Sequence, residues 1–430
     1  EEAFFWFYLP DYRGDVGIEC GFDKDLRGTA GAKSVLVNNA GYRQAENIWS
    51  PAEPGRNVVL TLDSSVQQAA ERALESVRNT RGTTTCGAVV VMDVQTGDIL
   101  AMVSLPTLDP NWYVRGITHE QWQRIVDLSA EKNRATYENY MPGSVFKTIV
   151  GMAALEAGLN PEDVIHIEPN PAQPNKGHKR VGNHTFKDTA PPGDYNFRRA
   201  LKLSSNSYFI TIGLRTGPER IIRLAQRAHF GERAGLPTRQ DATGQLPSLQ
   251  RLRGAWTDGN TGNICIGQDP VWVTPLQIAV LTAAIANGGN VLWPRLVERI
   301  EAADPTLSIP PQVFPSGRVR DRLGVSRRTL GILREAMLAD VEDSDGTGRG
   351  AAVPGLRICG KTGTAQVQDE RNNKTGQTTW FASFAPYEQP RYAVVVMVED
   401  GASGAACALP AGKIYTALLE RERSKLAKSQ

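Results

Sequence analysis

A serine and a lysine three residues apart are the first candidates for chemistry in this sequence. Ser144 and Lys147 stand at the predicted start of a helix, and residues i and i+3 are neighbours on a helix. A serine needs a proton acceptor to act as a nucleophile, and a lysine accepts a proton only where burial or nearby cations lower its pKa. Residues 145–155 are apolar apart from Lys147 and Thr148, which predicts a buried helix. The pair is therefore a candidate nucleophile and base.

The same spacing also occurs in ordinary helices, where a serine N-cap is followed by a solvated lysine. Two further motifs favour the catalytic interpretation. Ser204-Ser205-Asn206 lies between helical patterns at residues 197–203 and 207–214. Lys361-Thr362-Gly363-Thr364 lies in an extended segment, residues 355–367. The order and separation of the three motifs argue against coincidence.

This set of motifs resembles the superfamily of penicillin-binding proteins and serine β-lactamases. The resemblance runs from about Arg56 to about Ala417 and is strongest to the transpeptidase domain of class B penicillin-binding proteins. The stretches that carry it are Asn133-Arg134-Ala135, Tyr140-Met141-Pro142-Gly143-Ser144, Gly262-Asn263, Ile266-Gly267-Gln268, Val273-Thr274-Pro275-Leu276-Gln277 and Gly360-Lys361-Thr362-Gly363-Thr364-Ala365. Within class B, Ile266-Gly267-Gln268 is more similar to the elongation (rod-shape) enzymes than to the septal ones.

The resemblance implies a serine-type D,D-transpeptidase that uses no cofactor and no metal. Ser144 would attack the penultimate D-Ala carbonyl of a peptidoglycan stem peptide and release the terminal D-Ala. The acyl-enzyme would then be resolved by an amine from a neighbouring strand, and β-lactams would acylate the same serine. Lys147 would accept the Ser144 proton, Ser204 would relay a proton to the leaving group, and Asn206 would hold Lys147 and the substrate backbone.

The remaining site residues come from the third motif. By resemblance, the backbone N–H groups of Ser144 and Thr364 would form an oxyanion hole. Lys361 would keep the cleft positive and help to keep Lys147 neutral. Thr362 and Thr364 lie two apart on a strand and would bind the substrate carboxylate from one side, with Lys361 pointing to the other. Gly363 would let the strand approach the substrate closely.

The coarse secondary structure predicts an α/β fold with a five-stranded antiparallel sheet. Strand-like runs at residues 88–93, 99–104, 356–367, 379–385 and 392–399 are joined in part by short hairpins. Helices before, between and after them, such as residues 64–77 capped by Asp63, would cover both faces. Residues 301–320 are rich in proline and polar groups and are interpreted as a surface loop.

Two regions are expected along the chain. Residues 1–55 are interpreted as the remnant of an N-terminal pedestal domain with a linker, because residues 22–28 resemble the segment before the transpeptidase domain and turn residues follow. Residues 56–430 form the transpeptidase domain. The apolar run at residues 3–9 is too short to span a bilayer. The resemblance implies an N-terminal anchor outside this sequence, in the bacterial inner membrane, with the catalytic domain in the periplasm.

Composition excludes some other classes. The net charge is +2 and there is no long basic run, so nucleic acid is not an expected partner. The five cysteines form no metal or redox pattern. His178 and His184 near Asp188 could bind zinc, but a surface loop is the favoured interpretation. The expected partners are stem peptides and β-lactams and, by resemblance, a membrane glycosyltransferase and scaffold proteins of the elongation complex.

Three alternatives stay open at this point. A serine β-lactamase shares the motifs, but the sequence after Ser204 has no obvious Glu-x-x-Leu-Asn segment to activate water. A β-lactam sensor domain shares Ser-x-x-Lys, but the pedestal-like N-terminal region argues against it. A non-catalytic scaffold of a cell-wall complex is disfavoured by three intact motifs.

Overall fold

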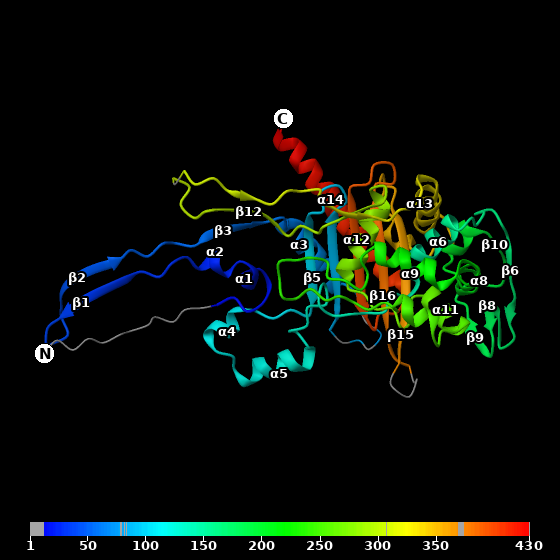
Figure 1. Cartoon of the computed structure of the whole chain (residues 1–430), viewed down its shortest axis with the longest axis horizontal. Coiled ribbons are helices and arrows are strands. Elements are labelled where there is room, and N and C mark those ends of the chain that lie inside the picture. Colours follow the sequence, from blue (N-terminus) through cyan, green and yellow to red (C-terminus); the bar gives the residue numbers. More distant parts are fainter. Residues whose placement is uncertain are drawn as a thin grey trace. The chain divides into compact units, whose positions relative to one another are not determined.

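The computed structural model describes residues 13–77, 80, 82, 84–306, 308–368 and 374–429, and Figure 1 shows their helices and strands. The chain folds into two compact units. The first contains the residues up to Thr61 together with residues 236–240 and 296–315. The second contains residues 62–235, 241–295 and those from Ser316 onward, and it carries all three motifs.

The second unit is built on one antiparallel sheet of five strands, as the sequence predicts. Its order is β15 (Cys359–Gln368), β16 (Lys374–Ala385), β17 (Tyr392–Glu399), β4 (Gly87–Asp93) and β5 (Ile99–Leu105). Every neighbouring pair is antiparallel. The sheet therefore joins strands from both ends of the chain, and β15 is an edge strand.

One face of the sheet packs against α3 (Ser64–Glu75) and α14 (Gly404–Ser429) (Figure 1). Alternate residues of the central strands, such as Val394 and Val396, point into this core together with Ile414 of α14. α3 begins where predicted, because the Asp63 carboxylate accepts hydrogen bonds from the backbone N–H groups of Ser65 and Val66.

The opposite face packs against α12 (Pro275–Ala286), whose residues are all buried. The helical layer on this side also contains α6 (Lys147–Glu156), α7 (Phe197–Lys202), α8 (Asn206–Thr216), α9 (Pro218–Arg227), α11 (Asp258–Cys265) and α13 (Arg327–Glu342). α6 contacts α8, α9 and α13, which explains why its side chains are apolar on nearly every side. The sequence prediction of a buried helix after Ser144 is confirmed.

The shorter elements of the second unit connect these layers. They are α4 (Asn111–Arg115), α5 (His119–Leu128), η1 (Gly143–Phe146), β6 (Ile165–Ile167), β7 (Pro169–Asn170), β8 (Gln173–Val181), β9 (His184–Lys187), β10 (Gly193–Tyr195), α10 (Leu249–Arg253), β11 (Asn290–Leu292), β14 (Val319–Arg322) and η2 (Arg349–Ala351).

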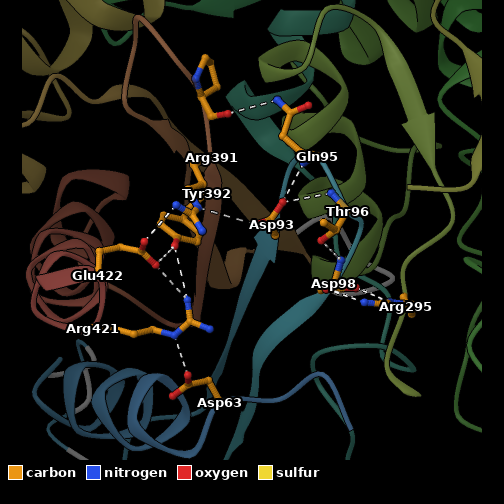
Figure 2. A network of polar contacts seen from close by, with 11 residues as sticks. Asp63, Asp93, Gln95, Thr96, Asp98, Arg295, Arg391, Tyr392, Arg421 and Glu422 are labelled. Carbon is orange, nitrogen blue, oxygen red and sulfur yellow. Dashed lines mark hydrogen bonds and ion pairs between the residues drawn. The ribbon is translucent and has the colours of Figure 1, made fainter. Parts of the chain in front are cut away.

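A network of polar contacts joins α3, β17 and α14 (Figure 2). Arg421 of α14 donates from Nε to Asp63 Oδ2 at 2.6 Å. The Tyr392 hydroxyl donates to Glu422 Oε1 at 2.5 Å, and Arg391 pairs with the other oxygen of Glu422 at 2.9 Å. The start of α3 and the second half of α14 are thereby fixed to one end of β17.

The first unit contains α1 (Gly17–Gly21), α2 (Asp23–Arg27), a hairpin of β1 (Ala32–Val37) and β2 (Arg43–Ser50), and a sheet of β13 (Gln312–Val313), β12 (Val297–Ala302) and β3 (Arg56–Leu60). The sequence interpretation of residues 301–320 as a surface loop is wrong in part. β12 and β13 reach into this range, and β12 pairs with β3, a strand far away in the sequence. Local composition does not reveal such long-range pairing.

No helix in the described part of the chain is both long enough and apolar enough to cross a bilayer.

Candidate active site

Ser144 lies in the 3₁₀ turn η1, directly before α6. The sequence predicts an α-helix around both Ser144 and Lys147, whereas the α-helix itself begins at Lys147. This difference strengthens the pairing, because side chains at i and i+3 eclipse each other in a 3₁₀ turn. Ser144 is half-buried, whereas its neighbours in the turn are buried.

Two glycines let the turn lie directly against the edge strand β15. A Cβ on Gly143 would lie 2.6 Å from the carbonyl oxygen of Thr364, and Gly143 has a positive φ of 54°. A Cβ on Gly363 would lie 2.9 Å from Val145 Cγ2. Both distances are too short for a real side chain, so a residue larger than glycine would push the strand away from Ser144.

The segment that leads into the turn is fixed to the sheet by polar contacts. Arg134 is buried and donates from Nε to Glu399 Oε1 at 3.0 Å, and the Tyr140 hydroxyl donates to the same oxygen at 2.7 Å. Trp380 of β16 donates from Nε1 to the Met141 carbonyl at 3.0 Å. Sequence analysis found Arg134 and Tyr140 by resemblance alone, because their partner Glu399 lies at the far end of the chain.

Lys147 is fully buried and brings the first two motifs together. Its Nζ donates to the Ser204 carbonyl oxygen at 2.6 Å and to Asn206 Oδ1 at 2.7 Å, and Ser204 Oγ lies 3.4 Å away. A neutral amine has two N–H groups and one lone pair. The two carbonyl-type oxygens occupy both N–H groups, which leaves the lone pair to accept a proton from a serine hydroxyl.

Electrostatics favour this neutral form. Burial lowers the pKa of Lys147 well below its ordinary value, and the positive charge of Lys361 lowers it further. The carboxylate of Asp188 acts in the opposite direction. Burial is the largest of these effects, so the pKa of Lys147 is lowered overall, as a lysine base requires.

The loop that carries Ser204 is held by the Asp188 carboxylate, which the sequence interpretation placed in a surface loop near His178 and His184. Asp188 accepts hydrogen bonds from Ser205 Oγ at 2.7 Å and from the backbone N–H groups of Asn206 and Ser207, both at 2.8 Å. Ser204 itself has a φ of 57°, a strained conformation for a residue with a side chain. Asp188 therefore stabilises the loop in the conformation that places Ser204 beside Lys147.

The zinc alternative for His178, His184 and Asp188 does not fit this arrangement. The two histidines lie on the β8–β9 hairpin, and both Asp188 oxygens accept hydrogen bonds from the loop. Throughout the described ranges, no group of three or more histidine, cysteine or acidic side chains is placed to hold a metal ion. No sequence signal marks the role of Asp188, because its partners lie 17 to 19 positions away.

Asn206 is oriented from both ends of its amide. Its Nδ2 donates to the Lys187 carbonyl at 3.0 Å, so Oδ1 is the atom that faces Lys147. In the opposite orientation the Asn206 amide nitrogen would face Lys147 Nζ, and both groups are hydrogen-bond donors. The sequence prediction that Asn206 holds Lys147 agrees with this geometry.

The third motif occupies the edge strand, with its side chains alternating as expected. In the β15–β16 register, Lys361 lies opposite Ala382 and Gly363 opposite Trp380, whereas Thr362 lies opposite Phe381. Cross-strand neighbours share a face. Phe381 belongs to the core under α14. Lys361 and Gly363 therefore face the helical layer that contains Lys147.

The two threonines of this motif differ in their surroundings. Thr364 is exposed, and its hydroxyl oxygen accepts a hydrogen bond from the Gly404 backbone N–H at 3.2 Å. Thr362 is buried, and its hydroxyl contacts the hydroxyl of Thr347. Thr347 was not singled out from the sequence.

Lys361 is also fully buried, but its charge state differs from that of Lys147. Burial lowers the pKa of Lys361 to about 8, while the carboxylate of Asp340 opposes the decrease. Lys361 is therefore mostly charged at neutral pH. A neutral lysine next to Ser204 and a charged one on β15 provide a base and an anion-attracting group on the same helix-covered side of the sheet.

The comparison with protein families decides what this arrangement is. The family model described as the penicillin-binding protein transpeptidase domain matches residues 87–420. The chain belongs to this transpeptidase family. A second model, the penicillin-binding protein dimerisation domain, matches residues 8–60.

Individual relatives agree with this placement in the penicillin-binding protein family. The chain is 30% identical over 418 residues to the peptidoglycan D,D-transpeptidase MrdA of Haemophilus influenzae, covering 92% of this chain and 61% of that protein. It is 33% identical over 412 residues to the peptidoglycan D,D-transpeptidase PbpA of Mycolicibacterium smegmatis, covering 91% and 79%. The chain thus spans about three fifths of the length of the Haemophilus relative.

A solved structure agrees as well. The complex of penicillin-binding protein PBP2 with MreC from Helicobacter pylori contains a chain that aligns with a TM-score of 0.75 and 28% identity, covering 95% of this chain and 72% of that one. The names MrdA and PBP2 confirm the predicted resemblance to class B penicillin-binding proteins of the elongation type. The transpeptidase fold expected from the sequence is likewise confirmed.

Proposed function

We propose that this chain is a serine-type peptidoglycan D,D-transpeptidase that acts on D-Ala-D-Ala stem peptides through an acyl-enzyme on Ser144. The observation that carries the proposal is the environment of Lys147. Both of its N–H groups in the neutral form are occupied by Ser204 O and Asn206 Oδ1, so its lone pair is available as a base.

Acylation follows from this geometry. Ser144 Oγ attacks the penultimate D-Ala carbonyl while its proton passes to Lys147. The negative charge that develops on the carbonyl oxygen is stabilised by the backbone N–H groups of Ser144 and Thr364, at the contact between η1 and β15. This role is supported by the close approach of Gly143 to Thr364.

Collapse of the intermediate breaks the peptide bond and expels the terminal D-Ala. Its amine takes a proton from the Ser204 hydroxyl, which is replenished from the protonated Lys147 3.4 Å away. The acceptor amine of a second stem peptide then attacks the ester, and the same groups run in reverse to release Ser144.

The edge strand β15 binds the terminal carboxylate of the substrate. Lys361 supplies positive charge, and Thr362, Gly363 and Thr364 form the part of β15 against which the stem peptide lies. An exposed strand edge can bind an extended peptide through its main chain. β-Lactams, which carry a carboxylate and a reactive amide, would occupy the same site.

The proposal extends to partners and location. A scaffold protein is supported by the Helicobacter pylori complex, in which PBP2 is bound to MreC. We extend the proposal to a membrane glycosyltransferase that supplies nascent glycan strands and to a periplasmic site of action, where peptidoglycan is built.

The test is acylation and its lifetime. After exposure to a β-lactam, intact-mass analysis should show one adduct, absent in Ser144→Ala. The adduct should persist far beyond a single catalytic cycle, because the sequence after Ser204 has no obvious Glu-x-x-Leu-Asn segment that would activate water for hydrolysis. A purified stem pentapeptide with an acceptor amine should yield free D-Ala and a cross-linked product. Sustained hydrolysis of a chromogenic cephalosporin would favour a β-lactamase, and no adduct at all would favour a scaffold.

A further inference from the structure

A buried carboxylate lies behind the third motif. Asp340 of α13 has no solvent exposure. Its Oδ1 accepts hydrogen bonds from the backbone N–H of Thr347 at 2.9 Å and from the Thr347 hydroxyl at 2.6 Å, whereas its Oδ2 has no hydrogen-bond partner. A buried carboxylate oxygen without a partner destabilises the fold unless something compensates for it. The Ser144, Lys147 and Ser204 machinery does not use it.

The compensating group is a second buried charge. Asp340 and Lys361 act on each other electrostatically, although no ion pair within contact distance joins them. Burial raises the pKa of Asp340 above its ordinary value, and the charge of Lys361 and hydrogen bonds from Thr347 and from the Gly348 backbone N–H oppose that rise without reversing it. A charged lysine without solvent exposure needs a nearby negative charge. Asp340 supplies it from the neighbouring helix.

The same carboxylate begins a chain of hydrogen bonds that ends on β15. The Thr347 hydroxyl contacts Asp340 Oδ1 and the Thr362 hydroxyl. A hydroxyl has only one proton to donate. The Thr347 proton goes to the carboxylate, because a charged oxygen accepts a hydrogen bond more strongly than a hydroxyl does. Thr347 must then accept the proton of Thr362.

We propose that Asp340 is a positioning residue for recognition of the substrate carboxylate: it keeps Lys361 charged and, through Thr347, turns the Thr362 hydroxyl away from the substrate. This inference rests on the proposed transpeptidase function. It leaves the exposed Thr364 as the hydroxyl donor for the carboxylate, since its oxygen already accepts from Gly404 and its own proton is free.

Several other charged groups on and around α13 and β15 contact partners other than Asp340 and Lys361. On α7 and the loop after α13, Arg198 pairs with Asp343, and Lys202 pairs with Asp343 and Asp345. The remaining engagements are Glu342 with Arg357, Arg349 with the Ser344 carbonyl, Arg334 with the Tyr387 carbonyl, Glu156 with the Ser326 backbone N–H, Lys413 with Ser76, and Lys147 with Ser204 and Asn206. α12 carries no charged residue.

The experiment compares Asp340→Asn with Glu335→Gln, an exposed acid on the same helix. The rate of acylation is measured with benzylpenicillin and with its methyl ester between pH 6 and 10. Asp340→Asn should slow the reaction of the free acid about tenfold more than that of the ester, the scale of one hydrogen bond to a charged group. Glu335→Gln should behave as the unaltered protein.

The pH profile gives a second readout, which a purely structural role would not change. Removing the Asp340 charge lowers the pKa of Lys361 below its value of about 8, so Lys361 loses its proton at lower pH. The alkaline limb of the acylation profile should therefore move to lower pH in Asp340→Asn. An unchanged ratio of acid to ester rates, together with an unchanged alkaline limb, would overturn the proposal.

A second pair of variants decides the question if Asp340→Asn does not fold. Thr347→Ser keeps the hydroxyl and should keep the ratio of acid to ester rates of the unaltered protein, whereas Thr347→Val frees the Thr362 proton and should change that ratio. Equal behaviour of the two overturns the inference. Failure of the unaltered protein to be acylated by either compound would instead reject the proposed function, so the two failures are distinguishable.

Discussion

Lys147 Nζ lies 2.6 Å from the carbonyl oxygen of Ser204, in a loop where Ser204 itself adopts a φ of 57°. The hydrogen bond explains why the strained conformation persists. This conformation turns the Ser204 carbonyl toward Lys147 and also brings the Ser204 hydroxyl close to Lys147 Nζ. Strain of this kind costs roughly 1–3 kcal/mol and is found where the surrounding structure enforces it.

The first prediction concerns the base. Lys147→Ala should slow acylation by a β-lactam by about a hundredfold or more, the usual scale for a general base. Lys147→Arg should not restore the rate, because a guanidinium does not lose its proton at accessible pH. Stopped-flow or quenched mass-spectrometric acylation rates test both variants. Fast acylation in either would assign the base elsewhere.

The second prediction concerns Asp188, which holds the Ser205–Ser207 loop. Asp188→Asn should slow acylation by about tenfold through loss of charged hydrogen bonds. Because the Asp188 charge raises the pKa of Lys147, its removal lowers that pKa, and the acid limb of the acylation profile should move to lower pH. Asp194→Asn, at an exposed acid on β10, is the matched control. A slower reaction with an unmoved acid limb would leave Asp188 only a structural role.

The third prediction separates the two threonines of β15. Thr364→Val should weaken acylation by a carboxylate-bearing β-lactam about tenfold more than acylation by its ester, since Thr364 is exposed and its proton is free. Thr362→Val should discriminate less between acid and ester, because the Thr362 proton is directed to Thr347. The ratio of acid to ester rates in each variant measures this. Equal ratios in the two variants would indicate that Thr362 also binds the carboxylate directly.

The fourth prediction uses the network in Figure 2. Burial raises the pKa of Asp63, but hydrogen bonds from Ser65 and Arg421 outweigh it and lower the pKa to about 2. A carboxyl with a lowered pKa stabilises the fold above its ordinary pKa and loses that contribution as the pH falls toward 2. Arg421→Met should therefore reduce the free energy of unfolding by about 1 kcal/mol at pH 7, after allowance for solvent screening.

The difference between Arg421→Met and the unaltered protein should shrink as the pH falls from 4 to 2, within the range where the protein still folds, as measured by urea denaturation. Arg423→Met, at an exposed position on the same helix, should have little effect at any pH. A difference that stays constant down to pH 2 would mean that Arg421 acts by packing and not through Asp63.

The sequence predicts the sheet and the motifs because both are encoded locally. Continuous apolar runs mark β4 and β17, turns separate them from their neighbours, and Asp63 signals the start of α3. The supporting carboxylates are different. Asp188, Asp340 and Glu399 stand in unremarkable surroundings, and their roles depend on partners that only the folded chain brings close.

The same reason explains the error at residues 301–320. β12 and β13 are short, and β12, which pairs with β13, also pairs with β3 from a distant part of the sequence. A proline-rich polar stretch satisfies the usual criteria for a loop even where its ends are paired as strands. The helix start at Ser144 differs from the prediction for a related reason. The sequence predicts an α-helical turn there, but the turn that contacts β15 is a tighter 3₁₀ turn.

The last prediction tests the contact between η1 and β15. Gly143 and Gly182 both have a positive φ of similar size, 54° and 57°. A Cβ on Gly143 would lie 2.6 Å from the Thr364 carbonyl oxygen, whereas a Cβ on Gly182 would meet nothing within 4 Å. Gly182→Ala should therefore lose only the stability that a left-handed backbone conformation costs a residue with a side chain, about 1–2 kcal/mol. Acylation should be unchanged.

Gly143→Ala has the same conformational cost, but it must also displace the strand from the serine. A misplacement of about 1 Å at a reacting group can slow a reaction about a hundredfold. Acylation should fall by that order in Gly143→Ala, well beyond what its loss of thermal stability explains. Melting temperatures and acylation rates of both variants provide the comparison. If Gly143→Ala were acylated as fast as Gly182→Ala, close contact with Thr364 would not be what positions Ser144.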